Sequence, residues 1–305
     1  MKVNGLSCIK LRMMGINGKG IAVRWGLKAQ KMNIAQKIIE AHKLKFGSLP
    51  LLQQCSVSGS ALFNADCMYI LPLIPDKSVQ LILADLPYGE IECVWDSIIP
   101  MDKLWKQYER IITDNGAIVL TATLKFALKL INSNERLFKY ELIWDKVKPS
   151  NIFIGKLRPL NKHEFILIFS KGNIANGSKT NMLYNPQMER QKPRTSKLYG
   201  QSDMRFRENL KSEAKIIDKK YPKSILTFSN ANNKDKIHPT QKPLELIKWL
   251  IYTYSNENDM VLDNTMGVGT TCLGAKELNR RFIGIEKEVK YYELAVGRVF
   301  GQHCH

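Results

Sequence analysis

The stretch "MVLDNTMGVGTTCLGAKELNRRFIGIEKE", residues 260–288, decides the fold of this chain. It reads as a short apolar strand, a glycine loop, a helix from Thr270 to Asn279 and a second strand that ends in Glu286. Glycines in such a loop let a ligand approach the backbone, and the helix N-terminus favours negative charge. A carboxylate at the end of the second strand accepts hydrogen bonds from both ribose hydroxyls. The stretch therefore predicts a nucleoside-binding unit of an α/β protein.

The remaining strands of the sheet must come from upstream sequence, because only nineteen residues follow Glu286. Strand patterns occur at residues 61–64, 78–84, 116–122, 139–145 and 163–172, and helical patterns lie between them, as at 101–112 and 123–131. This alternation predicts a Rossmann-like, mostly parallel sheet. The glycine loop stands at the C-terminal end, so we expect a circularly permuted order. Cys272 replaces the third glycine of a dinucleotide fingerprint, which makes NAD a poor candidate.

A second stretch, "LILADLPYG" from Leu81 to Gly89, ends a buried strand in a carboxylate. Pro87 and Gly89 force a turn immediately after Asp85, and Tyr88 lies within that turn. Strand ends of open α/β sheets meet in a crevice at the carboxyl edge of the sheet. We therefore expect the Asp85 carboxylate, the rigid turn and the aromatic ring to share a crevice with the glycine loop. Taken alone, this stretch is equally consistent with a strand followed by an ordinary turn.

The formal net charge of +18 is concentrated in two segments. Residues 1–60 contain ten Lys and Arg against one acid, and residues 173–237 contain fourteen against six, so the rest is near neutral. Such segments favour a polyanionic partner, although two solvated faces would give the same counts. The first segment contains one expected helix, about Lys28 to Phe46. It reads equally as an organelle transit peptide, a DNA-binding extension or the product of a misassigned start codon.

Other features narrow the class of protein. The six cysteines are scattered without a C-x-x-C pair, which favours reduced thiols in the cytoplasm over disulfides or a zinc site. The tail His303-Cys304-His305 reads as a frayed terminus, so we predict no metal. No apolar run approaches the roughly 18 residues of a membrane span, and no secretory signal is visible. These features predict a soluble, cytoplasmic protein.

Four motifs together resemble the amino-group DNA methyltransferases that use S-adenosylmethionine. They are "DLPYG" at 85–89, "HPTQKP" at 238–243, "DNTMGVGTT" at 263–271 and "FIGIE" at 282–286. The catalytic motif precedes the cofactor motif, which is similar to the β-class order. The resemblance covers about residues 62–300. It implies a basic N-terminal extension at 1–60, the catalytic half at 61–172, an inserted target-recognition region at 173–237 and the cofactor-binding half at 238–305.

The resemblance implies a catalytic set in the turn after the second strand. Asp85 and the backbone carbonyl of Leu86 would accept hydrogen bonds from the target amino group, Pro87 would fix the turn, and Tyr88 would stack on the base. The amine of a nucleobase is a poor nucleophile because its lone pair is delocalised, and two acceptors favour its reactive geometry. A base inside a duplex must be flipped out. Stacking worth about 1–3 kcal/mol offsets part of that cost.

The resemblance also implies a cofactor-binding set. Asp66 would contact the adenine of the cofactor, the Asp263 loop its methionine part, and Glu286 its ribose. The full set is Asp66, Cys67, Thr240, Lys242, Asp263, Gly267, Gly269, Thr270 and Glu286. For Lys242, a solvated surface lysine is the alternative.

The motifs depart from the common pattern at two places. Leu86 replaces a proline, which matters little because the role needs only a carbonyl. Asn264-Thr265 replaces Pro-Phe, so an aromatic ring near the cofactor is lost, and we expect local packing or cofactor affinity to differ.

The predicted function is methyl transfer to the exocyclic N6 of adenine in a specific sequence of double-stranded DNA. The acidic Asp85 resembles the adenine enzymes, whereas serine is commoner there among cytosine-N4 enzymes. The alternatives are a cytosine-N4 methyltransferase and an inactive DNA-binding relative. A restriction endonuclease counterpart and a homodimer are further partners to expect, and arginines such as Arg205 and Arg207 are expected to contact phosphates.

Overall fold

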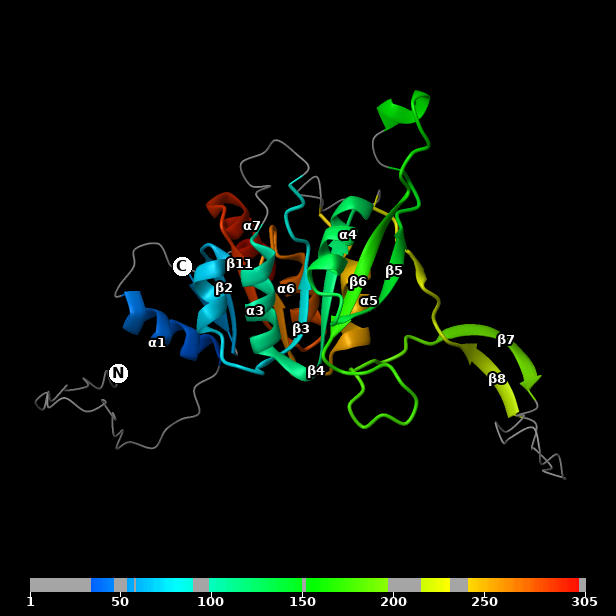
Figure 1. Ribbon diagram of the computed structural model, residues 1–305, viewed down its shortest axis with the longest axis horizontal. Helices are drawn as coiled ribbons and strands as arrows, with labels where there is room; N and C mark the ends of the chain where they lie inside the picture. Colours follow the sequence, from blue (N-terminus) through cyan, green and yellow to red (C-terminus); the bar gives the residue numbers. More distant parts are fainter. Residues whose placement is uncertain are drawn as a thin grey trace, which may run out of the picture. The chain divides into compact units, whose positions relative to one another are not determined.

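The computed structural model describes residues 34–46, 54–57, 59–89, 99–149, 152–196, 215–230 and 241–301. These residues form a sheet in the order β1-β2-β11-β10-β3-β4-β6-β5-β9 (Figure 1). Its strands are β1 (Gln54–Val57), β2 (Ser60–Asn64), β3 (Val79–Ala84), β4 (Ile112–Ala122), β5 (Phe138–Asp145), β6 (His163–Ser170), β9 (Ile225–Thr227), β10 (Met260–Asp263) and β11 (Arg281–Glu286). Every predicted strand is present, within a few residues of its expected bounds.

Strand direction brings many chain segments to one edge of this sheet. Five adjacent strands run parallel, in the order β2, β11, β10, β3 and β4. Strand β6 lies between β4 and β5 and runs antiparallel to both. The carboxyl ends of the parallel strands and of β5 therefore meet the amino end of β6. The prediction of a mostly parallel Rossmann-like sheet is confirmed. Although β10 and β11 are the last strands in sequence, they lie between β2 and β3. The circular permutation itself stays a prediction.

Helices cover both faces of the sheet. The first core contains buried residues of α1 (Ile34–Phe46), α2 (Cys67–Ile70), α3 (Met101–Ile111) and α4 (Leu124–Ser133), and the second those of α5 (Leu244–Tyr254), α6 (Thr270–Glu277) and α7 (Val289–Phe300) (Figure 1). Short 3₁₀ turns occur at Leu71–Leu73 and Ile152–Lys156. Alternation along β3 explains the two cores, since Ile82 packs in the first and Leu81 in the second. In the described ranges, no helix combines the length and apolar character of a membrane span.

Local sequence explains where these helices begin. Pro243 occupies the N-cap position of α5, before Leu244, where its missing N–H and fixed φ are tolerated. The first turn of α3 carries Asp102, whose charge suits the helix dipole. Of the helix expected at about 28–46, the described part is α1, and residues 28–33 lie outside the described ranges.

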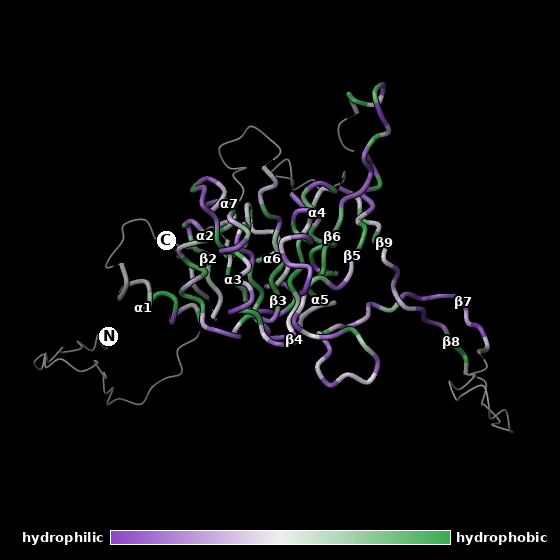
Figure 2. Tube along the Cα trace, viewed as in Figure 1, coloured by the Kyte–Doolittle hydropathy of each residue, from purple (hydrophilic) through white to green (hydrophobic). Residues whose placement is uncertain are grey.

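The segment 173–237 contains both a separate ribbon and a strand of the main sheet. Strands β7 (Glu189–Ser196) and β8 (Lys215–Lys220) pair only with each other, and they are mostly hydrophilic (Figure 2). Sequence analysis missed β9, which pairs with β5 and buries Leu226. Arg205 and Arg207 lie outside the described residues, as do most of residues 1–60 and the tail 302–305. The proposed domain boundaries stay a prediction.

Candidate active site

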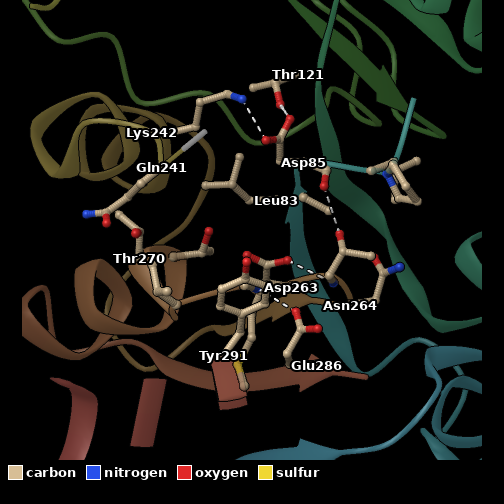
Figure 3. A pocket seen from close by; sticks show the side chains of 18 of the residues that line it. Leu83, Asp85, Thr121, Gln241, Lys242, Asp263, Asn264, Thr270, Glu286 and Tyr291 are labelled. Atoms are coloured by element: carbon tan, nitrogen blue, oxygen red, sulfur yellow. Dashed lines mark hydrogen bonds and ion pairs between the residues drawn. The ribbon is translucent and has the colours of Figure 1, made fainter. Parts of the chain in front are cut away.

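A cavity of about 590 Å³ opens at the edge where the strand ends meet. Most residues of the predicted catalytic and cofactor-binding sets line this one cavity. Figure 3 shows Lys242 and Thr121 pointing toward Asp85 on one side of the cavity, with Asp263 and Glu286 on the other side. The predicted residues in its wall are Asp66, Cys67, Asp85, Leu86, Pro87, Tyr88, Lys242, Asp263, Gly267, Thr270 and Glu286. Gly269 is outside this set, and Thr240 lies outside the described residues.

The Asp85 carboxylate, directly after β3, is held by three donors. Its Oδ1 accepts hydrogen bonds from the hydroxyls of Thr121 and Tyr88, the latter at 2.7 Å. Its Oδ2 accepts a hydrogen bond from the ammonium of Lys242 at 2.6 Å. The Thr265 hydroxyl donates to the Asp85 backbone carbonyl at 3.1 Å, which links the end of β3 to the loop after β10. These bonds fix the carboxylate at the cavity wall.

The turn after Asp85 is anchored by packing. The Leu86 side chain is buried, and Pro87 has a restricted φ. The Tyr88 ring lies 5.0 Å from the ring of Phe126 in α4, measured between centroids. Burial, reinforced by the nearby Asp85 charge, raises the pKa of Tyr88 well above its ordinary value. Tyr88 therefore stays a neutral hydrogen-bond donor.

Lys242 is a buried charge between two carboxylates. Its ammonium lies 2.6 Å from Asp85 and 3.4 Å from Oε2 of Glu164, the second residue of β6. Burial disfavours its positive charge, but Asp85 and Glu164 outweigh burial, so the pKa of Lys242 is raised. Its side chain is only 10% exposed, so the alternative of a solvated surface lysine is wrong.

Sequence analysis missed several residues of this wall. Glu164 and Lys146 pair at 3.2 Å, and Thr121 and Thr265 bind Asp85. Glu164 belongs to none of the four motifs. The available signal was a carboxylate at the start of an apolar strand, but its place at this edge depends on the antiparallel direction of β6.

The cofactor side contains two carboxylates, the buried Asp263 and the half-buried Glu286. Burial raises the pKa of Asp263 to about 7, with smaller contributions from the charges of Asp85 and Glu286, although hydrogen bonds from Thr271 and the Thr265 backbone oppose the shift. Burial also raises the pKa of Glu286. The Glu286 oxygens accept hydrogen bonds from the backbone N–H groups of Gly267 at 2.9 Å and Glu288 at 2.8 Å. Glu286 therefore also fixes the glycine loop.

The two glycines of the loop have different surroundings. Both have positive φ, +51° at Gly267 and +73° at Gly269. A Cβ at Gly267 would meet no atom within 4 Å, so the backbone there borders open space in the cavity wall. A Cβ at Gly269 would lie 2.9 Å from Cβ of Ala295. Gly269 therefore lets α7 pack against the loop.

The departure at Asn264 has a packing explanation. The buried Asn264 side chain accepts a hydrogen bond from the hydroxyl of Tyr108 in α3. Burial raises the pKa of Tyr108 well above its ordinary value, so its hydroxyl remains a donor. A proline could not accept this bond from its side chain. Nδ2 of Asn264 is buried and makes no hydrogen bond within the described ranges.

The fold is Rossmann-like, and Asp85, Glu286 and the glycine loop line one cavity at the carboxyl edge of its sheet, which defines the class of α/β proteins that bind a nucleoside there. Residues 79–297 match the family of N6 and N4 DNA methylases, described as DNA methylase. The match covers more than half of the chain, so the chain belongs to this family.

Individual relatives agree with this assignment. The type II methyltransferase M.HinfI of Haemophilus influenzae is 28% identical over 79% of this chain and 68% of its own length. M1.MboII of Moraxella bovis is 27% identical over 77% of this chain and 94% of its own. The solved complex of M1.HpyAVI with S-adenosylmethionine has a TM-score of 0.53 and 26% identity, and covers 78% of this chain and 98% of that chain. PvuII cytosine-N4 methyltransferase, at TM-score 0.58 and 16% identity over 82% and 89%, shares the fold.

Proposed function

We propose that this chain transfers a methyl group from S-adenosylmethionine to the exocyclic N6 of adenine in a specific sequence of double-stranded DNA. The observation that carries the proposal is the joint cavity. Asp85 and its turn line the same space as Gly267 and Glu286. A base presented to Asp85 and a nucleoside cofactor at Glu286 would therefore face each other.

The described residues fit the cofactor. The cavity has room beside Gly267, and the N-terminus of α6 and the Glu286 carboxylate border it. Asp66 would contact the adenine, Glu286 the ribose, and the Asp263 loop the methionine part. When bound, the cofactor supplies an electrophilic methyl group on a sulfonium. The complex of M1.HpyAVI with S-adenosylmethionine supports this choice.

Asp85 and the Leu86 carbonyl each accept a hydrogen bond from the amino group of the extruded base. This holds the nitrogen lone pair toward the methyl group. The lone pair would form the new N–C bond, the electron pair of the broken S–C bond would stay on sulfur, and the nitrogen would then release one proton to the Asp85 carboxylate that accepts its hydrogen bond. Positioning and fixed charges account for most of such catalysis. Tyr88 stacks on the base and offsets part of the cost of flipping it out.

The finer specificity rests on Asp85. An acidic residue at this position resembles the adenine enzymes, which favours N6 of adenine. Cytosine-N4 transfer is the second candidate, because both targets are exocyclic amines that the same acceptors would hold.

The segment 173–237 is the proposed binding region for the DNA substrate, because its ribbon β7–β8 carries exposed cations. The type II names of the relatives support a restriction–modification setting with an endonuclease counterpart. A homodimer and a cytoplasmic, DNA-associated location complete the proposal.

The test is to incubate the protein with S-adenosylmethionine carrying a labelled methyl group and with mixed DNA, and then to separate the nucleosides by mass spectrometry. Label in N6-methyladenine supports the proposal. Label in N4-methylcytosine selects the second candidate. DNA binding without label in any nucleoside would leave only an inactive DNA-binding relative.

A further inference from the structure

Four charged side chains of alternating sign form a row of ion pairs that begins at the Asp85 carboxylate. Asp85 lies 2.6 Å from Lys242, Lys242 lies 3.4 Å from Glu164, and Glu164 lies 3.2 Å from Lys146. The four come from the end of β3, the segment before α5, the start of β6 and the residue after β5. Mixed strand directions therefore bring them to one edge of the sheet.

Glu164 contacts its two lysines in different ways. Its Oε1 accepts a hydrogen bond from Lys146. Its Oε2 is buried, makes no hydrogen bond to a described residue, and faces the ammonium of Lys242 at ion-pair distance. The hydrogen bond of that ammonium goes instead to Asp85. Toward Lys242, Glu164 therefore contributes its negative charge rather than a hydrogen bond.

We propose that Glu164 is a positioning residue for methyl transfer, which acts on Asp85 through Lys242. The inference rests on the proposed function. Buried charges are costly unless they are balanced. The two carboxylates and two ammonium groups of the row cancel. Without the charge of Glu164, these four side chains would hold one carboxylate and two ammonium groups, which is one net positive charge within the row.

The sign of that charge matters for the chemistry. The amino nitrogen becomes positively charged as it gains a methyl group, and remains so until its proton leaves. A net positive row beside Asp85 would oppose this charge, and because Lys242, Lys146 and Glu164 are at most 20% exposed, solvent screens the effect only in part. Glu164 would thus lower the barrier to transfer without touching the base or the cofactor.

The test compares wild type with Glu164→Gln, Glu164→Asp and the double variant Glu164→Gln/Lys146→Met. We expect Glu164→Gln to lower kcat about tenfold or more, with KM for DNA and cofactor within about twofold. Glu164→Asp should retain most of the activity. The double variant restores a neutral row and should recover a large part of kcat. A packing role would not give this recovery, because the double variant disturbs more contacts.

A Glu164→Gln variant with kcat within about twofold of wild type would overturn the proposal. So would a double variant as slow as the single one while circular dichroism shows both folded. If Glu164→Gln does not fold, the kcat values of Glu164→Asp and of the double variant are compared with that of wild type in its place, with the same expected results. If wild type itself transfers no label to DNA, the proposed function fails, and this inference fails with it. Active wild type with an insensitive Glu164→Gln removes the inference alone.

Discussion

The ammonium of Lys242 lies 2.6 Å from Oδ2 of Asp85, although the two residues are 157 positions apart. The contact joins the catalytic motif after β3 to the motif before α5. It gives Lys242 a partner on the base side of the cavity, whereas sequence analysis expected Lys242 on the cofactor side. Its part in cofactor binding stays a prediction. The ion pair holds the Asp85 carboxylate in one orientation beside Thr121 and Tyr88.

The first prediction concerns this carboxylate. Asp85→Ala should abolish methyl transfer, because one acceptor of the amino group is lost, and cofactor binding should remain measurable. Label transfer and calorimetry with S-adenosylmethionine measure the two effects. Asp114→Ala is a matched control, because that carboxylate is exposed and pairs with Lys77. Near-normal turnover of Asp85→Ala would show that the catalytic assignment is wrong.

The second prediction concerns Glu286. Glu286→Ala should weaken binding of S-adenosylmethionine by about 1.5–3 kcal/mol, because a charged hydrogen bond to the ribose is lost. Loss of the bond to Gly267 N–H would loosen the glycine loop in addition. DNA affinity should not change. Glu245→Ala removes an exposed carboxylate of α5 outside the cavity wall and serves as the control in calorimetry. Unchanged cofactor affinity of the Glu286 variant would remove Glu286 from the site.

Sequence patterns predicted β2 to β6, β10 and β11, most of which contain a compact apolar run, but not β1, β7, β8 or β9. The ends of β3 and β11 could be predicted because Asp85 and Glu286 directly follow the apolar runs of these strands. The three-residue strand β9 was missed, because Ile225 to Thr227 has no pattern that distinguishes it from a loop. It forms by pairing with β5, which is a long-range contact.

Cavity residues that belong to sequence motifs could be predicted. Cavity residues that are brought there only by tertiary contacts could not. Asp85, Asp263 and Glu286 follow from strand ends. Glu164 depends instead on the reversed direction of β6, and no local pattern reports strand direction. The roles of the two loop glycines also needed the structure, because the proximity of Gly269 to Ala295 is a contact between distant segments.

The third prediction concerns pH. Burial raises the pKa of Asp263 from 3.8 to about 7. From roughly pH 4 to pH 7, the folded state keeps a proton that the unfolded chain has lost. The stabilisation of the folded state that comes from this raised pKa is complete below pH 4 and is lost as the pH rises through 7.

Asp263→Asn keeps an acceptor but cannot titrate. Relative to wild type, its free energy of unfolding should therefore increase between pH 5 and pH 8, by on the order of 2 kcal/mol. Urea unfolding at both pH values measures this difference. Asp102→Asn, at an exposed position of α3, is the control and should follow wild type. Parallel pH curves for wild type and Asp263→Asn would contradict a buried carboxyl with a raised pKa.

The fourth prediction concerns the ribbon β7–β8. Arg190 pairs directly with Lys219 across the two strands, and Arg194 pairs with Ile217 beyond an irregularity in the register. Like charges opposite each other destabilise a ribbon unless an anion compensates them. Glu189 and Lys220 pair with each other at the neighbouring register position, and their salt bridge at 3.0 Å balances that pair. A two-stranded ribbon fits the major groove of DNA.

Replacing Arg190, Arg194 and Lys219 by Ala should therefore weaken DNA binding and flatten its salt dependence. Each phosphate contact contributes about 0.9 to the slope of log affinity against log salt concentration, so losing three should reduce the slope by about 2.7. Fluorescence anisotropy across a salt series measures it, and cofactor affinity should stay unchanged. Lys220→Ala is the matched control, because it removes a cation already balanced by Glu189. The rival view is that residues 1–60 supply the DNA affinity. If deletion of residues 1–55 erases DNA binding while the triple variant keeps the slope of wild type, the ribbon is not the DNA contact.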